Sequence, residues 1–254
     1  MARIGDALDA AAEAIRPYMG VEIGVRRKGE RGDPLTEADL AANAALRRRL
    51  PREDEGWLSE ESRDDGGRLA RSRVWIVDPL DGTREFVQGI PEWCVSIGLV
   101  VDGEAVAGGI LNPATGQRVV GAVGSGVRLN GEPVGISRRG SLEGATVLAS
   151  RSEVGRGEWA RFGEAAFTVV PCGSVAYKLG LVAAGLADVT WTLVPKNEWD
   201  VAAGAALVRA AGGVVMHADG REARFNRERP ALPDFLAGPA HLLAEFRSRW
   251  LGRA

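Results

Sequence analysis

The pattern of apolar and polar positions changes character about half-way along the chain. In the first half, apolar residues at helical spacing predict two amphipathic helices, and alternating runs joined by the turn dipeptides Asp102-Gly103 and Asn130-Gly131 predict an antiparallel sheet. From about residue 140, short apolar strands alternate with helical segments, which is typical of an α/β arrangement. We therefore expect an α+β chain with an N-terminal half at residues 1–138 and an α/β C-terminal half at residues 139–254.

One apolar run differs from the others because it ends on acidic residues. Val74–Val77 is rich in β-branched side chains and predicts a buried strand, and Asp78 and Asp81 follow it directly. Pro79 cannot continue a strand ladder and Gly82 permits an unusual backbone angle, so we expect a turn that presents both aspartates on one side. Two such carboxylates can share one hard cation or bridge two, although similar tetrapeptides also occur in ordinary solvated turns.

The residues after this turn offer a place for an anion. Arg84–Val87 predicts a short helix, and the backbone amides of Gly82 and Thr83 would lie at its beginning, where amide groups attract negative charge. A cation site beside an anion site suggests that the chain acts on a phosphate ester.

Further acidic residues stand at the ends of other predicted elements. Glu60 and Glu61 close a short strand. If this strand pairs with Val74–Val77, one of the two acids is aimed at Asp78; a solvated surface pair is the alternative. Asp200 begins a helix rich in alanine and glycine, either as an N-cap or as a carboxylate aimed into a cleft, since small residues let such a helix approach its neighbours closely.

An earlier segment holds two more acids. Thr36 and Asp39 have the spacing of a helix capping box, and capping alone explains them as well as a role in a site does. Asp33 precedes Pro34, outside the predicted helix, where it is free to hold a hydroxyl group or a water molecule.

Composition narrows the classes of partner. The 32 basic and 34 acidic residues leave a net charge of −2, which creates no field that would draw nucleic acid or an anionic membrane. No apolar window approaches the length of a membrane span, and acids interrupt the N-terminal helix where a signal sequence would be apolar. Cys94 and Cys172 are expected to be small buried hydrophobes in a cytoplasmic protein, and the isolated His217 and His241 exclude a zinc-type cluster. Any metal is therefore expected to be held by oxygen.

Taken together, four motifs resemble the inositol monophosphatase superfamily over nearly the whole chain: Asp33-x-x-Thr36-x-x-Asp39, Ser59-Glu60-Glu61-Ser62, Trp75–Thr83 and Trp199-Asp200-x-Ala202-Ala203-Gly204. The resemblance implies a layered α-β-α-β-α sandwich of the inositol monophosphatase or fructose bisphosphatase type, in which the C-terminal half closes the active-site cleft. It also implies an often lithium-sensitive phosphomonoesterase that uses two or three Mg²⁺ ions, acts on a small molecule and forms a homodimer.

The resemblance also implies roles for individual residues. One Mg²⁺ would be held by Glu60, Asp78 and the carbonyl of Leu80, and a second by Asp78, Asp81 and Asp200. Asp33 and Thr83 match the pair that polarises the attacking water, with Glu60 also in the catalytic set. The amides of Gly82 and Thr83 match the phosphate cradle, so no covalent enzyme intermediate is expected.

The branch within the superfamily rests on a few substrate-facing positions. Inositol phosphatases have a glutamate where this chain has Leu193, and commonly an acid where it has Lys178. Lys178 and Asn197 resemble the 3′(2′),5′-bisphosphate nucleotidases, and a lysine suits a substrate with a second phosphate. The segment Pro91–Leu99 is closer to the inositol branch.

The resulting prediction is hydrolysis of the 3′-phosphate of 3′-phosphoadenosine 5′-phosphate. Inositol monophosphate and a sugar bisphosphate are the alternative substrates, and a catalytically silent protein that binds metal and phosphate is the alternative function. A purely structural explanation of the acids as caps and turns fails on their joint spacing.

Overall fold

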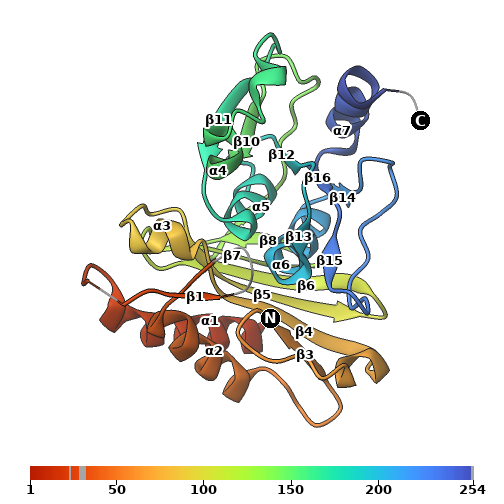
Figure 1. Cartoon of the computed structure of the whole chain (residues 1–254). Coiled ribbons are helices and arrows are strands. Elements are labelled where there is room, and N and C mark those ends of the chain that lie inside the picture. The colour runs from red at the N-terminus through yellow and green to blue at the C-terminus, as the bar shows by residue number, and fades with distance from the viewer. Residues whose placement is uncertain (23, 29–32, 253–254) are drawn as a thin grey trace.

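The computed structural model describes residues 1–22, 24–28 and 33–252, and it consists of alternating layers of helices and sheets (Figure 1). Helices α1 (Ala2–Ile15) and α2 (Glu37–Arg49) cover one face of a seven-stranded sheet. Helices α5 (Val175–Ala183) and α6 (Glu198–Ala210) lie between this sheet and a five-stranded sheet. Helix α7 (Ala240–Phe246) packs on the outer side of the second sheet. The expected α-β-α-β-α sandwich is confirmed.

The seven-stranded sheet has its strands in chain order, which follows from the hairpins that the sequence predicts. Its first two strands are parallel and the others are antiparallel. The strands are β3 (Gly56–Ser59), β4 (Arg73–Asp81), β5 (Cys94–Val101), β6 (Glu104–Asn112), β7 (Gln117–Ala122), β8 (Gly126–Leu129) and β9 (Glu132–Val134).

The five-stranded sheet has the order β11-β10-β12-β16-β14, with β11, β10 and β12 mutually parallel and β16 antiparallel to both of its neighbours. Its strands are β10 (Thr146–Ser150), β11 (Thr168–Cys172), β12 (Val189–Thr192), β14 (Val214–Met216) and β16 (Phe235–Gly238). All of them follow residue 139, as the change of pattern predicts. Whether the two halves of the chain are separate units stays a prediction.

Short elements complete the architecture. Two small antiparallel pairs join β1 (Arg26–Lys28) to β2 (Asp33–Leu35) and β13 (Lys196–Asn197) to β15 (Ala231–Leu232). The remaining helices are α3 (Thr83–Val87), α4 (Arg151–Gly155), η1 (Arg16–Tyr18), η2 (Gly67–Ala70), η3 (Ala160–Phe162) and η4 (Arg247–Leu251). No helix in the described ranges has the length and apolar character needed to cross a membrane. Both cysteines are buried free thiols, as expected.

The predicted turn at Pro79 is wrong in its geometry, because β4 runs through this residue to Asp81. Asp78 pairs with Ser96 and Asp81 pairs with Cys94, so the three steps along β4 match two along β5. The extra residue is a β-bulge, a position at which a strand tolerates proline. Both aspartates therefore stay on the strand that the sequence predicts, at its end.

Helix α6 approaches the first sheet very closely because both surfaces are built from small residues. A Cβ atom on Gly108 of β6 would lie 2.3 Å from the carbonyl oxygen of Ala203, and one on Gly204 would lie 2.2 Å from Cβ of Leu179 in α5. Only glycine fits at such contacts. The expected close packing of this helix is confirmed, and it brings the first turn of α6, with Asp200, to the sheet.

Glu55 connects α1 to the beginning of the first sheet. The Arg3 guanidinium donates to both of its carboxylate oxygens at 2.8 Å, and the indole N–H of Trp75 donates to Oε2 at 2.8 Å. Burial alone would raise the pKa of Glu55, but the bonds from Arg3, Trp75 and the Arg52 backbone outweigh it and lower the pKa from 4.5 to about 2. A lowered acid pKa stabilises the fold above pH 4.5, and this contribution is lost as the pH falls towards 2.

We expect Glu55→Gln to lower the free energy of unfolding by about 2 kcal/mol at neutral pH, because it removes a charged acceptor from the buried Trp75 and the half-buried Arg3. The difference from the wild type should shrink between pH 4.5 and pH 2, measured by urea unfolding at several pH values. Glu13→Gln is the control, since Glu13 of α1 makes an exposed ion pair with Arg16 and its replacement should change stability little. A difference that does not vary with pH would contradict this account.

Candidate active site

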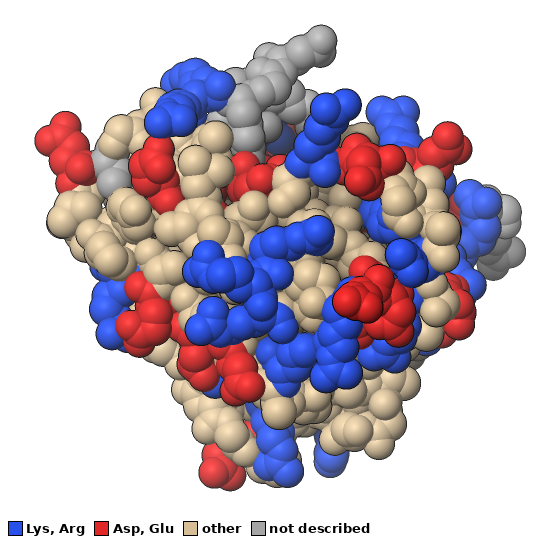
Figure 2. All heavy atoms as spheres, turned by 90° about the horizontal axis from the view of Figure 1, so that it is seen from below, with Lys and Arg blue, Asp and Glu red and all other residues tan. Residues whose placement is uncertain are grey.

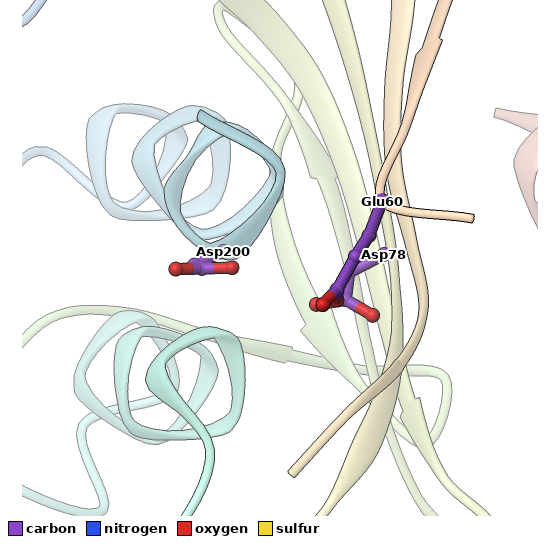
Figure 3. A group of neighbouring side chains, drawn as sticks. All are labelled: Glu60, Asp78 and Asp200. Carbon is purple, nitrogen blue, oxygen red and sulfur yellow. The ribbon is translucent and has the colours of Figure 1, made fainter. Parts of the chain in front are cut away.

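Three carboxylates from three separate elements meet between the first sheet and α6. Glu60 directly follows β3, Asp78 lies in β4, and Asp200 lies in the first turn of α6. One oxygen of each lies within 4.8 Å of one oxygen of both others. Figure 3 shows Glu60 and Asp78 side by side, with Asp200 on the helix facing them. The expected pairing of the strand before Glu60 with Val74–Val77 is confirmed, and the structure shows that it is parallel. This pairing aims Glu60 at Asp78.

The cluster carries more negative charge than its surroundings compensate. Burial raises the pKa of Asp78 well above its usual range, and the charges of Glu60, Asp81 and Asp200 raise it further. Burial likewise raises the pKa of Asp200, followed by the charges of Asp81 and Glu60. A hard divalent cation would relieve this repulsion, and a set of carboxylate oxygens at this spacing suits Mg²⁺. The donor chemistry therefore fits the predicted metal.

Asp81 stands beside this group and is oriented by the C-terminal half of the chain. Its Oδ2 accepts hydrogen bonds from Ser174 Oγ at 2.7 Å and from the backbone N–H of Ala176 at 2.6 Å. Burial raises the pKa of Asp81, although these two donors and the charge of Lys178 act in the opposite direction. With Oδ2 occupied, Oδ1 is the oxygen left for a cation.

The chain after Asp81 has the backbone expected of it. Gly82 adopts φ +96°, and α3 begins at Thr83. A Cβ atom on Gly82 would lie 3.0 Å from the carbonyl oxygen of Glu92, so both the angle and the close contact favour glycine. The Leu80 carbonyl accepts a hydrogen bond from Thr83 Oγ1 at 3.1 Å, which places both groups at the end of β4.

Thr83 has Asp39 as its acidic neighbour. Thr83 Oγ1 lies 3.0 Å from Asp39 Oδ1, while the other oxygen of Asp39 accepts from the backbone N–H and Oγ1 of Thr36 at 2.8 and 2.6 Å. Asp39 thus caps α2, as the sequence predicts, and also binds Thr83 after β4, a role that sequence reasoning left open. Asp33 begins β2, but its side chain lies outside the described part of the structure, so its pairing with Thr83 stays a prediction.

A family comparison agrees with this geometry. The model of the inositol monophosphatase family matches residues 3–247. The chain belongs to this family. Inositol monophosphatase 3 of Solanum lycopersicum is 34% identical over 256 residues, which cover 95% of this chain and 92% of that protein. The fructose-1,6-bisphosphatase/inositol-1-monophosphatase of Thermotoga maritima is 34% identical over 206 residues, or 78% of this chain and 77% of that protein.

Solved structures give the same result for the fold. The extragenic suppressor protein suhB of Bartonella henselae superposes with a TM-score of 0.83 at 30% identity, covering 98% of this chain and 96% of the other. As a member of the inositol monophosphatase family, the chain is a phosphoric monoester hydrolase that acts on a small phosphate ester. The recognition that the motifs suggested is confirmed at the level of the family.

The two residues that favoured the nucleotidase branch lie in different surroundings. Lys178 is buried, and its Nζ donates to backbone carbonyls of the segment before α5. Asn197 is exposed at the beginning of α6, and its backbone N–H donates to Asp200 Oδ2 at 3.1 Å. The contact of Lys178 with a second phosphate stays a prediction, but the ammonium has other partners here.

Thr83→Ala should lower the rate of phosphate release by about a hundredfold. The reason is that the Thr83 hydroxyl, which is fixed by its hydrogen bond to Asp39, is expected to orient the attacking water molecule. Mg²⁺ affinity measured by calorimetry should change little, since the cation is held by carboxylates. Thr83→Ser keeps the hydroxyl and should retain most of the activity. Should Mg²⁺ binding collapse together with the activity, Thr83 belongs to the metal site instead.

Proposed function

We propose that the chain is a Mg²⁺-dependent phosphomonoesterase whose first cation is held by Glu60, Asp78 and the Leu80 carbonyl, and whose second is held by Asp78, Asp81 and Asp200. The observation that supports this most is the meeting of Glu60, Asp78 and Asp200 from three separate elements, together with the burial that raises the pKa of Asp78, Asp81 and Asp200. A surface pair or a set of helix caps would have no reason to converge.

The protein's own groups then have separate tasks. Asp39 accepts from Thr83 and fixes its hydroxyl, so that this hydroxyl can orient a water molecule for in-line attack on phosphorus. The amides of Gly82 and Thr83 are the proposed cradle for the phosphate oxygens. Bound Mg²⁺ would lower the pKa of the attacking water and offset charge on the leaving oxygen. Lithium sensitivity, a homodimer and a cytoplasmic location belong to the same proposal and rest on the family resemblance and the buried thiols.

For the substrate, we propose a nucleotide with a second phosphate, of the 3′-phosphoadenosine 5′-phosphate type. Leu193 stands where a carboxylate would be needed to accept hydrogen bonds from a polyol ring. It lines a cavity of about 340 Å³ whose other walls are the aromatic Trp159, Phe162 and Trp191, Val194 and the charged Glu153, Glu158 and Arg161. In this proposal the aromatic side chains stack on a nucleobase.

Lys196 adds a positive charge next to this cavity. Its Nζ lies 3.1 Å from Oε1 of Glu153, another residue that lines this cavity. Burial and the charges of Asp81 and Glu60 raise the pKa of Asp200, and the positive charge of Lys196 offsets part of this rise. Its side chain keeps 18% of its surface exposed, so it could pair with a second phosphate. In this proposal Lys196 binds the second phosphate, a role that the sequence suggested for Lys178.

Inositol monophosphate is the second candidate, and the names of the relatives favour it. The tomato relative is named inositol monophosphatase 3, and the Thermotoga relative carries both an inositol and a fructose bisphosphate activity in its name. A silent binding protein is less well supported, since all the predicted acids are present in the chain.

A phosphate-release panel at saturating Mg²⁺ decides among these substrates. It would contain 3′-phosphoadenosine 5′-phosphate, adenosine 5′-monophosphate, inositol 1-phosphate and fructose 1,6-bisphosphate. We expect the highest kcat/KM for the first, and we expect Lys196→Met to raise KM by about tenfold for that substrate alone. If the wild type prefers inositol 1-phosphate, the substrate is inositol monophosphate and the nucleotide proposal is wrong. If no ester releases phosphate, the chain is a binding protein.

Asp81→Asn tests the metal site itself. The substitution keeps the shape of the side chain and removes one negative charge, so we expect phosphate release to fall by about two to three orders of magnitude with the fold intact. Circular dichroism checks the fold, and Asp219→Asn serves as the control because Asp219 is an exposed partner of Arg221. Wild-type turnover in Asp81→Asn would overturn the two-cation assignment.

A further inference from the structure

The ammonium of Lys178 is bound entirely by backbone oxygens. Lys178 is 3% exposed, and its Nζ donates to the carbonyl oxygens of Ser174, Cys172 and Gly173 at 2.8, 3.3 and 3.4 Å. An ammonium group has three N–H donors, so each donor has a carbonyl acceptor. Burying such a group is costly unless it is fully bound, which indicates that this segment of the chain requires it.

The segment that Lys178 binds delivers two donors to Asp81. It leads from β11 into α5 and ends at Ser174, whose φ of +49° is a left-handed conformation that non-glycine residues seldom adopt. Ser174 Oγ accepts from the backbone N–H of Tyr177 at 2.9 Å and donates to Asp81 Oδ2 at 2.7 Å. The N–H of Ala176 reaches the same oxygen. The orientation of Asp81 therefore depends on a strained backbone.

Glu92 and Glu85 pack closely against Gly173, in the same segment of residues 172–174. The backbone N–H of Gly173 donates to Glu92 Oε2 at 2.7 Å, and a Cβ atom on Gly173 would lie 2.5 Å from Cγ of Glu85 in α3. Three carbonyl oxygens that converge on one point repel one another, and they do so beside an acidic cluster. A cation between them offsets both effects, whereas an apolar side chain would leave the carbonyls without this donor.

We propose that Lys178 is a positioning residue for the second cation site: its ammonium holds the carbonyls of residues 172–174 so that Ser174 and Ala176 keep Asp81 oriented. This inference rests on the proposed role of Asp81 as a Mg²⁺ ligand. It assigns Lys178 no contact with the substrate. Loss of the ammonium should therefore affect every phosphate ester alike and act through the metal.

The test compares Lys178→Met with the wild type. Mg²⁺ binding is measured directly by calorimetry without substrate, and phosphate release is measured on one monophosphate and one bisphosphate ester. We expect Mg²⁺ affinity to fall by about tenfold or more, as for other groups that orient metal ligands, and both activities to fall by the same factor at fixed Mg²⁺. Ser174→Ala should give a similar loss of affinity. The double variant should be little worse than either single one, because both act through the same segment.

Tyr177→Phe is the matched control. It changes the side chain next to Lys178 in α5 and removes only a hydroxyl that bonds to Gln117. Mg²⁺ affinity should therefore stay unchanged. Unchanged Mg²⁺ affinity in Lys178→Met, a loss confined to the bisphosphate, or additive losses in the double variant would each overturn the inference. If Lys178→Met does not fold, Lys178→Gln, which keeps two N–H donors without the charge, is judged by the same outcomes.

The result separates this inference from the proposed function. If Asp81→Asn loses Mg²⁺ binding and Lys178→Met binds Mg²⁺ like the wild type, the positioning role of Lys178 is wrong, but Asp81 remains a metal ligand. Wild-type Mg²⁺ binding in Asp81→Asn defeats the metal assignment itself.

Discussion

The fold has to hold several negatively charged carboxylates close together at a site that is partly shielded from water. The oxygens of Glu60, Asp78 and Asp200 lie within 4.8 Å of one another, Asp81 adds a fourth charge nearby, and the raised pKa values of the aspartates show the cost. Carboxylates on one mobile loop would move apart. Here each acid is fixed by the packing of the element that carries it, so the repulsion is opposed by the core of the whole molecule and is available to bind a cation.

Three features of the backbone supply this fixation. Parallel pairing of β3 with β4 sets the position of Glu60, and a one-residue slip would turn the end of β3 to the other face. The bulge between Asp78 and Asp81 keeps both aspartates on one strand. The contact of Gly108 with Ala203 lets α6 lie against the sheet closely enough for Asp200 to complete the cluster, and Gly204 lets α5 pack closely on α6. None of these features is a contact between the acids themselves.

Sequence reasoning succeeded where one local pattern determines one local structure. The strand before Asp78, the positive φ at Gly82, the capping box at Thr36 and the small residues of α6 could all be predicted this way. It failed where two locally equivalent solutions exist. A bulge and a turn both accommodate Pro79, and only the pairing with β5 selects the bulge.

The same limit applies to single side chains. A capping aspartate uses one oxygen for its helix, and nothing near Asp39 in the sequence shows that the other oxygen meets Thr83, which is 44 residues away. A lysine in a helix can face a ligand or its own backbone, and the three carbonyls that bind Lys178 are visible only once the preceding segment is folded. Such roles depend on long-range contacts, so local motifs underdetermine them.

The two halves of the chain contribute different parts of the acidic site. The N-terminal half carries Glu60, Asp78 and Asp81, whereas the C-terminal half supplies Asp200 and the donors that orient Asp81. The cavity beside Leu193, which has aromatic and charged side chains in its lining, also comes from the C-terminal half, on segments that carry none of the clustered acids. Substitutions in that lining therefore leave the charge of the cluster unchanged. The charge of the acidic cluster and the lining of that cavity are thus set by separate segments of the chain.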